Sequence, residues 1–356
     1  MHKILIMTNF PKLIREWYCE NGRQLPWRET KDPYKIWISE IILQQTQVKQ
    51  GLEYYRNFIK RFPDVQTLAR ATETELMQQW QGLGYYSRAR NIHHAAKAII
   101  NEHNGLMPQT YKKIRTLKGV GPYTAAAIAS FAFRLPYPVV DGNVYRLLSR
   151  LFAKEIPIDS TEGKKYFYNL ADNLLDRADP ATHNQAIMEM GALICKPANP
   201  KCDECPVVNH CKAYGTKSQN RFPVKQKKII RKKRFFNYLI IIKGNKTIVQ
   251  KRAKQDIWQG LYQFPLLETS KRTPKNKIVE LIEEGTGVKV TAKKAHEKKH
   301  LLTHQELHAV FYRIKWPTTE NLPEFFDEIA TEEIKKEDVP KIPFPQLIRE
   351  NLKNIL

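Results

Sequence analysis

A chain of 356 residues with 42% hydrophobic residues and 15 glycines can bury at least one sizeable core and more naturally forms two domains. Its 59 Lys and Arg residues outnumber 36 Asp and Glu, and the net charge of +23 favours a polyanionic partner, with nucleic acid the first candidate. No apolar run approaches a membrane span and the N-terminal apolar core is too short for a secretory signal, so we expect an intracellular protein with no membrane partner.

Residues 1–217 carry the apolar spacing of amphipathic helices, and prolines and glycines separate one segment from the next. The pattern predicts helices over residues 34–48, 54–62, 74–80, 88–101, 124–132 and 144–151. There is no internal repeat and no low-complexity tract. This part of the chain is therefore predicted to be mainly α-helical.

Glu40 lies in the apolar run IWISEIIL of the helix predicted at residues 34–48. Its neighbours three and four positions away include Ile36, Trp37 and Leu43, which share its helical face. Burial among such side chains raises the pKa of a carboxyl group, which suits a general acid. A glutamate that faces solvent, or one paired with a buried arginine, fits this segment equally well.

Two turns combine amide, aromatic and basic groups: Gln44-Gln45-Thr46 and GLGYYSRAR at residues 82–90. Such groups can wedge into a base stack and hold flanking phosphates. Taken alone, a polar helix end and a glycine-bounded loop are the simpler interpretation.

The stretch from Leu117 to Asn143 combines a glycine turn with a capped helix. Gly119-Val120-Gly121 predicts a sharp turn whose N–H groups can approach an anion such as a DNA phosphate at a helix N-terminus. Asp141 precedes the helical run at residues 144–151, a position that suits a helix cap. An ordinary helix–turn–helix with a capped second helix has the same features.

Four of the five cysteines cluster with the spacing C-x6-C-x2-C-x5-C, as Cys195, Cys202, Cys205 and Cys211. In an intracellular protein this favours a metal centre over disulfides, and both tetrahedral zinc and a [4Fe–4S] cluster take four thiolates. Zinc ribbons usually pair two short C-x2-C knuckles, whereas one short spacing here lies between two longer ones, which favours iron–sulfur. The remaining Cys19 is predicted to be a core thiol.

The composition changes after Lys217, and eight of the fourteen residues 221–234 are basic while none is acidic. We interpret this stretch as a connector near DNA phosphates; a solvated linker, or a nuclear-import signal for RKKR alone, has the same composition. Strand patterns follow at residues 235–243, 246–252 and 307–316, with a helix near residues 275–284.

Five long stretches carry a family resemblance: LPWRETKDPYKIWISEIILQQTQV (25–48), WQGLGYYSRARN (80–91), LKGVGPYTAAAIAS (117–130), VVDGNVYRLLSR (139–150) and NQAIMEMGALICKPANPKCDECPVVNHC (184–211). They resemble the helix-hairpin-helix DNA glycosylases with an iron–sulfur loop, and within these the MutY type of adenine DNA glycosylase. The resemblance implies a mainly α helix-hairpin-helix glycosylase domain with a [4Fe–4S] loop at residues 1–217 and a basic connector at 218–234. It also implies an α+β Nudix-like lesion-recognition domain at 235–356.

The resemblance implies a monomer that removes adenine mispaired with 8-oxoguanine or guanine from duplex DNA. Glu40 matches the family's catalytic acid and Asp141 the carboxylate that stabilises the sugar cation, a division similar to two-carboxylate glycoside hydrolysis. Tyr123 stands where relatives of the endonuclease III type carry a lysine nucleophile, so the resemblance implies a monofunctional glycosylase.

The resemblance also assigns binding roles. The adenine pocket is matched by Trp27, Arg28, Leu43 and Gln185. Positions that probe or wedge beside the oxidised guanine are matched by Gln45, Thr46, Leu83 and Tyr85. The phosphate-binding hairpin is matched by Gly119, Val120 and Gly121, and the ligands of a [4Fe–4S] cofactor by Cys195, Cys202, Cys205 and Cys211.

The C-terminal region departs from two patterns of its relatives. Aligned on Gly287-Val288, the hydrolytic Nudix box keeps only Glu284 among its acids, so we expect no diphosphate hydrolysis. Family members often carry Phe-Ser-His near the oxidised guanine, and this chain has Leu302, Thr303 and His304 there. Thr303 keeps a hydroxyl for lesion contact and His304 is retained, while the aromatic ring is lost.

Two alternatives belong to other functional classes: an endonuclease III-like glycosylase/lyase for damaged pyrimidines, and a non-catalytic DNA-binding iron–sulfur protein. Tyr123 and the Nudix-like region disfavour the first, and the two filled carboxylate positions disfavour the second. We expect the protein to act inside the cell, in the cytoplasm or nucleoid of a bacterial source.

Overall fold

A computed structural model describes the backbone of residues 2–226, 230–252, 256–317 and 331–356, with side chains from residue 9 onward. The chain divides into two compact units, Met1–Arg70 with Asn91–Lys228, and Ala71–Arg90 with Ile229–Leu356. We call these the first unit and the second unit. The predicted domain limits at residues 217 and 234 stay a prediction. Within the described ranges, no helix is long and apolar enough to cross a membrane.

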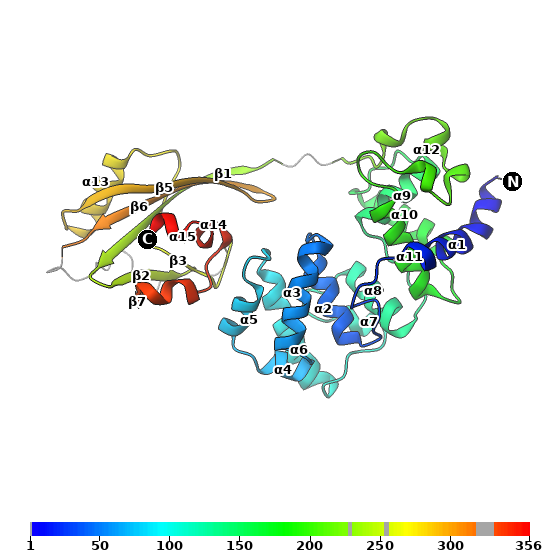
Figure 1. Cartoon of the computed structure of the whole chain (residues 1–356), viewed down its shortest axis with the longest axis horizontal. Helices are drawn as coiled ribbons and strands as arrows, with labels where there is room; N and C mark the ends of the chain where they lie inside the picture. The colour runs from blue at the N-terminus through cyan, green and yellow to red at the C-terminus, as the bar shows by residue number, and fades with distance from the viewer. Residues whose placement is uncertain (1, 227–229, 253–255, 318–330) are drawn as a thin grey trace. The chain divides into compact units, whose positions relative to one another are not determined.

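The first unit is built from helices (Figure 1). They are α1 (His2–Asn21), α2 (Pro33–Leu43), α3 (Val48–Arg61), α4 (Val65–Arg70), most of α6 (Ser87–His103), α7 (Tyr111–Ile114), α8 (Pro122–Phe133), α9 (Gly142–Phe152), α10 (Thr161–Leu174), α11 (Pro180–Leu193) and α12 (Lys212–Gly215). Short 3-10 turns lie at Cys202–Glu204, Val208–His210 and Gln219–Arg221. The predicted helices at residues 88–101, 124–132 and 144–151 are confirmed within two residues at each end.

The single helix predicted over residues 34–48 is wrong, because α2 ends at Leu43 and α3 begins at Val48. Asp32 caps the start of α2, where its carboxylate accepts hydrogen bonds from two backbone N–H groups. The helix stops because Gln44 leaves the helical region (ψ 112°) and Gln45 then adopts the left-handed conformation (φ 57°), both of which a continuing α-helix excludes. The polar turn between α2 and α3 therefore lies outside both helices, and its residues line a cavity.

One apolar core of the first unit lies among α1, α9, α10 and α11. Phe10, Ile14, Leu148, Phe167 and Met190 belong to it, and each is at most 1% exposed. Three of the clustered cysteines pack against the same core. The loop that carries them is therefore anchored on α9 and α11.

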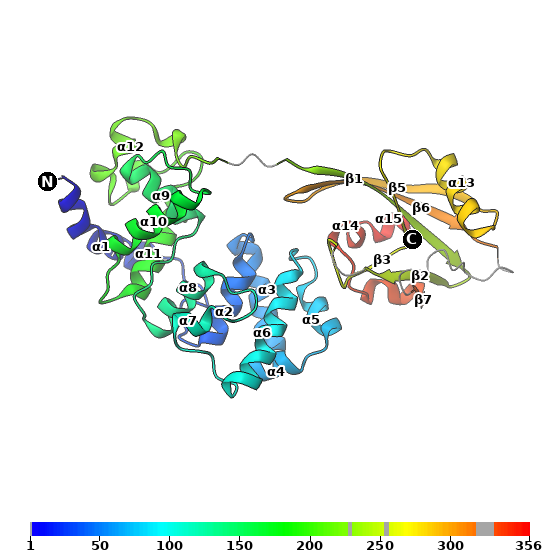
Figure 2. The same cartoon turned by 180° about the vertical axis from the view of Figure 1, so that it is seen from behind.

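The second unit holds α5 (Glu73–Trp80) and a seven-stranded mixed sheet (Figure 2). Its strands are β1 (Lys232–Lys243), β2 (Lys246–Lys251), β3 (Tyr262–Gln263), β4 (Leu266–Thr269), β5 (Thr291–Leu301), β6 (Gln305–Lys315) and β7 (Thr331–Lys335). The strand order is β3-β2-β1-β6-β5, with β4 paired to β1 and β7 to β2. Strand β1 pairs in parallel with β6, while the other pairs are antiparallel.

Strand β1 is buried on both faces of this sheet. Phe236, Tyr238 and Ile240 enter one core with α14 (Gln346–Arg349) and α15 (Leu352–Ile355). Leu239 and Ile241 alternate with them and meet α13 (Lys275–Thr286) on the other face. The strands predicted at residues 235–243, 246–252 and 307–316 and the helix at 275–284 are confirmed, as is the helix at 74–80.

Candidate active site

A cavity of about 320 Å³ opens in the first unit between α2, α8, α9 and α11. It brings together nine of the predicted site residues: Trp27, Arg28, Glu40, Leu43, Gln45, Thr46, Tyr123, Asp141 and Gln185. These residues come from segments spread over about 160 positions of the chain, so only the tertiary fold unites them.

Glu40 lies on α2, lines this cavity and is 7% exposed. Burial raises the pKa of its carboxyl group to about 7, and the negative charge of Asp141 adds to the rise. A hydrogen bond from Tyr123 and the positive charge of Arg28 oppose it. The open choice between a buried, a solvent-facing and an arginine-paired glutamate is thus resolved in favour of burial. The group sits where it can hold or release a proton near neutral pH.

Asp141 is the N-cap of α9, as its position in the sequence predicts. Its carboxylate accepts hydrogen bonds from the backbone N–H groups of Asn143 (2.9 Å) and Val144 (2.8 Å) and from Asn143 Nδ2 (2.7 Å). Burial raises the pKa of Asp141 above its ordinary value, and these donors limit the rise. The donors and the helix N-terminus favour the ionised form against the effect of burial, and they fix the carboxylate at one place in the cavity.

Arg28 enters the cavity from the segment before α2 and is held by Glu189, a residue that we did not predict. Arg28 Nη2 donates to Glu189 Oε2 at 2.7 Å, and Arg23 donates to both oxygens of the same carboxylate. Trp27 forms the neighbouring wall, packed edge-on against Tyr55 with ring centroids 5.1 Å apart. One signal could have revealed Glu189: it is an acid in the apolar run IMEMGAL, one helical turn after Gln185.

The glycine turn before α8 has two glycines with different constraints. Gly119 has φ 81°, and a Cβ there would lie 2.6 Å from Cβ of Asn91. Gly121 has no atom within 4 Å of such a Cβ and forms the N-cap of α8. Val120 between them is buried. The turn therefore presents open space in front of a helix N-terminus, where a phosphate can approach backbone N–H groups.

The other predicted lesion-contact residues line a separate cavity of about 510 Å³ in the second unit: Leu83, Tyr85, Thr303 and His304. The hydroxyl groups of Tyr85 and Thr303 are hydrogen-bonded. Tyr85 is 45% exposed with φ 46°, while Leu83 is buried at 8%. Leu302 and Trp258 also line this cavity, so an aromatic ring is present near the position where the predicted loop lost one.

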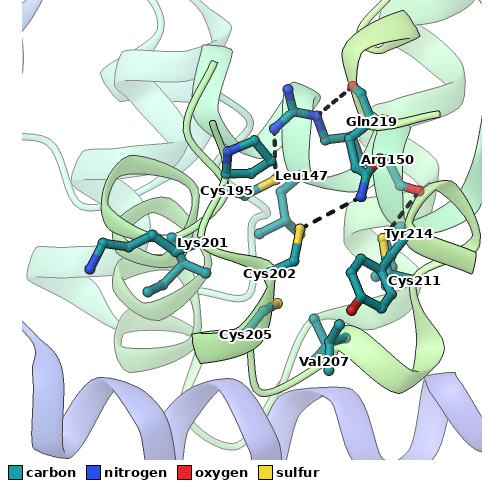
Figure 3. Close-up of a pocket in the computed structure, with 14 residues that line it drawn as sticks. Leu147, Arg150, Cys195, Lys201, Cys202, Cys205, Val207, Cys211, Tyr214 and Gln219 are labelled. Atoms are coloured by element: carbon teal, nitrogen blue, oxygen red, sulfur yellow. Dashed lines mark hydrogen bonds between the residues drawn. The ribbon is translucent and has the colours of Figure 1, made fainter. Parts of the chain in front are cut away.

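Cys195, Cys202, Cys205 and Cys211 all line one small cavity of about 30 Å³ (Figure 3). Arg150 Nη1 donates to Cys195 Sγ at 3.4 Å, and Gln219 Nε2 to Cys202 Sγ at 3.8 Å. Among the described residues, no set of three His, Cys, Asp or Glu side chains is spaced to hold a metal ion. A four-iron cluster is larger than one ion and takes one thiolate at each iron, so four thiols around a shared cavity with N–H donors to sulfur fit it.

The prediction that Cys19 is a core thiol is wrong, since its side chain is exposed. It follows the buried Ile14 by five residues on α1, which places it on the far side of that helix from the core.

In the second unit, Glu280 of the degenerate Nudix box is ion-paired with Lys277 on the exposed surface of α13.

Residues 38–166 match the family described as HhH-GPD superfamily base excision DNA repair protein, and residues 237–354 match the NUDIX domain. Among solved structures, a thermostable thymine-DNA glycosylase shares 28% identity and a TM-score of 0.57, covering 61% of this chain and all of that one. A trapped endonuclease III–DNA intermediate shares the fold at 20% identity and a TM-score of 0.52, covering 61% and 98% of the two chains. The predicted fold class, a helix-hairpin-helix domain followed by an α+β Nudix-like domain, is confirmed.

Curated relatives carry the resemblance over most of the chain. An adenine DNA glycosylase of Buchnera aphidicola subsp. Schizaphis graminum is 36% identical over 308 residues, which are 85% of this chain and 86% of that protein. Its counterpart from the Baizongia pistaciae subspecies is 38% identical over 306 residues, 84% of each chain. The human adenine DNA glycosylase is 42% identical over 216 residues, 58% of this chain and 40% of that protein. The chain therefore belongs to the MutY-type adenine DNA glycosylases, a family of enzymes that act on N-glycosyl bonds.

Proposed function

We propose that this enzyme excises adenine mispaired with 8-oxoguanine or guanine from duplex DNA, as a monomer inside the cell. The observation that carries the proposal is the pairing of Glu40, whose pKa is raised to about 7, with Asp141 in one cavity. The names of the relatives support adenine as the excised base. The net charge of +23 supports DNA as the partner.

The chemistry of the bond requires two carboxyl groups in different states. Without a proton, adenine would leave as an anion and is a poor leaving group. A proton must therefore reach the base as the N-glycosidic bond breaks, and Glu40 is the proposed donor. The sugar becomes cationic in the same step, and the proposed role of Asp141 is to stabilise that cation with its negative charge. Water then bonds to the sugar cation and gives its proton to the ionised Glu40, which completes hydrolysis and restores the acid. Tyr123 hydrogen-bonds Glu40 and supplies no amine for a Schiff base, which supports a monofunctional glycosylase.

The target bond is concealed in a duplex, so the adenine must be extruded into the cavity. We assign Trp27, Arg28, Leu43 and Gln185 to the extruded base, and the turn at residues 119–121 to a phosphate. We assign Gln45 and Thr46, which line the first cavity, to positions that probe or wedge beside the oxidised guanine. The cavity lined by Leu83, Tyr85, Thr303 and His304 is the proposed reader of the oxidised guanine.

We propose that Cys195, Cys202, Cys205 and Cys211 hold a [4Fe–4S] cluster. The cluster would supply a rigid, redox-active cross-link between four points of the loop, and the excision steps above involve only the chain's own residues. A brown protein that loses its colour in Cys202→Ser is the expected result. A colourless parent that contains stoichiometric zinc would contradict the cluster.

The assay that tests the function uses purified protein and three duplexes, with A opposite 8-oxoguanine, A opposite guanine, and an oxidised pyrimidine opposite its partner. Each reaction is read with and without alkali. We expect breaks at adenine only after alkali. Direct nicking at the pyrimidine would instead indicate a glycosylase/lyase, and retained binding without breaks would indicate a non-catalytic protein.

A further inference from the structure

Glu189 is a buried carboxylate beside the catalytic cavity for which the proposed excision chemistry has no role. It lies on α11 and its side chain is 1% exposed. It accepts four N–H donors: Arg23 N (3.0 Å), Arg23 Nε (2.7 Å), Arg23 Nη2 (2.7 Å) and Arg28 Nη2 (2.7 Å). Burial would raise the pKa of Glu189, but these hydrogen bonds outweigh burial and hold the pKa at about 2, so the group is ionised near neutral pH.

Both arginines line the cavity that Glu40 lines. Arg28 also donates through Nη1 to the backbone oxygen of Arg23 at 3.0 Å, and its guanidinium lies 5.6 Å from the ring centre of Tyr18. The guanidinium group of Arg28 is thereby held by several contacts, of which the hydrogen bond to Glu189 is the charge-assisted one. Two cations and one anion leave a net charge of about +1 at this edge of the cavity, and removal of the anion would make it about +2.

The net positive charge of this group of three residues acts on Glu40, the proposed proton donor. The ionisable groups that act directly on Glu40 are Tyr123 on α8, Asp141 at the start of α9, and Arg28 on the segment before α2, and Glu189 connects Arg23 to Arg28. Arg28 favours the ionised form of Glu40, which cannot donate a proton. A carboxylate bound directly to Arg28 weakens this effect while it keeps the guanidinium in place.

We propose that Glu189 is a positioning residue of the active site, which fixes Arg28 and Arg23 by hydrogen bonds and offsets their positive charge opposite Glu40. This inference rests on the proposed excision chemistry. Glu189 touches neither the base nor the sugar in that scheme, and it acts through the two arginines. A buried ion pair with a purely structural role would hold the fold and leave the protonation of Glu40 unchanged.

The test is the pH dependence of single-turnover adenine excision by the full chain. Excision requires protonated Glu40, so the rate of the parent falls as pH rises through the pKa of Glu40. In Glu189→Gln the unbalanced arginines favour the ionised form, so the fall should begin about one pH unit lower, with a rate about tenfold below the parent in the alkaline range. Arg23→Gln removes a cation instead and should move the fall to higher pH.

The double variant Arg23→Gln with Glu189→Gln has the parent's net charge at this edge of the cavity. The pH at which its excision rate falls should therefore return toward that of the parent. Circular dichroism melting checks that each variant is folded. Should Glu189→Gln fail to fold, the opposite shift of Arg23→Gln and the return in the double variant decide the question. The inference would be overturned if the excision rate fell at the same pH in all folded variants, or if it were lower by one constant factor at every pH.

A second readout does not need the reaction. The titration of the Glu40 carboxyl can be followed by carbon-13 NMR in the DNA-free protein, with the signal assigned by its loss in Glu40→Gln. Its midpoint should move down in Glu189→Gln and up in Arg23→Gln. If the parent excised no adenine from any duplex, the proposed function would fail, while this titration would still decide whether Glu189 sets the charge around Glu40.

Discussion

The enzyme should become more stable above neutral pH when its proposed general acid is replaced by glutamine. Burial raises the pKa of Glu40 from 4.5 to about 7, so the folded protein binds a proton that the unfolded chain releases between these values. Because the folded state holds more protons in this window, stability falls as pH rises from 4.5 through 7 and then stays level. Glu40→Gln removes this loss and keeps an oxygen that can accept the hydrogen bond from Tyr123.

The size of the effect follows from the pKa difference. A shift from 4.5 to about 7 corresponds to about 3 kcal/mol of unfolding free energy above neutral pH, at about 1.4 kcal/mol for each pKa unit. Part of this loss is already present at pH 5. The stability advantage of Glu40→Gln over the parent should therefore grow by about 2–3 kcal/mol between pH 5 and pH 8. Over the same range its excision rate should be about 10²- to 10⁴-fold below the parent's, because no proton is available.

Urea unfolding of parent and variant at pH 5, 6, 7 and 8 measures the stability difference. Glu53→Gln on α3 is the matched control, because this exposed glutamate lies on the first unit and its replacement makes the same chemical change. The control should track the parent at every pH. A stability difference between Glu40→Gln and the parent that is the same at pH 5 and pH 8 would refute the raised pKa and with it the assignment of Glu40 as the acid.

Four further predictions concern other parts of the site. Asp141→Asn should lower single-turnover excision by about 10²-fold while the melting temperature changes little, because asparagine also caps helices. Gly119→Ala should lower the unfolding free energy by about 1–3 kcal/mol, since its φ is 81° and the new Cβ would meet the Cβ of Asn91 at 2.6 Å, as a urea titration would show. Gly121→Ala, whose Cβ meets open space, should leave the unfolding free energy at the parent's value and weaken DNA binding in a fluorescence anisotropy titration. Thr303→Ala should lower the ratio of excision rates for A opposite 8-oxoguanine and A opposite guanine by about two- to tenfold, because it removes the hydroxyl that Tyr85 bonds; an unchanged ratio would count against the second cavity as the lesion reader.

Local signals predicted the elements whose limits are set by neighbouring residues. The cap at Asp141 and the apolar spacing behind it predicted α9, and the strand pattern at residues 235–243 predicted β1. The end of α2 could not be predicted in this way. Gln45 is compatible with a helix in isolation, and its left-handed conformation depends on the fold around it.

The residues of the candidate site were predicted mostly from family resemblance, and their environments only in part. The apolar neighbours of Glu40 left its burial open, because helical spacing shows which side chains share a face and not what covers that face. The contact between Glu189 and Arg23 spans 166 positions, and no local pattern encodes such a pairing. The prediction of Cys19 as a core thiol was wrong because residue type alone does not show which face of α1 packs against the core.

Three carboxyl groups share the first cavity, and they differ in the number of N–H and O–H donors that favour their ionised form. Glu189 accepts four donors from two arginines, and its pKa is held at about 2 despite burial. Asp141 accepts three N–H donors at a helix start, which limit the rise of its pKa that burial causes. Glu40 has Tyr123 as its hydrogen-bond donor, and its pKa rises to about 7. Since all three groups are buried, the donors separate the ionised Glu189 from Glu40, and either adding a donor to Glu40 or exposing it to water would lower its pKa and remove the acid.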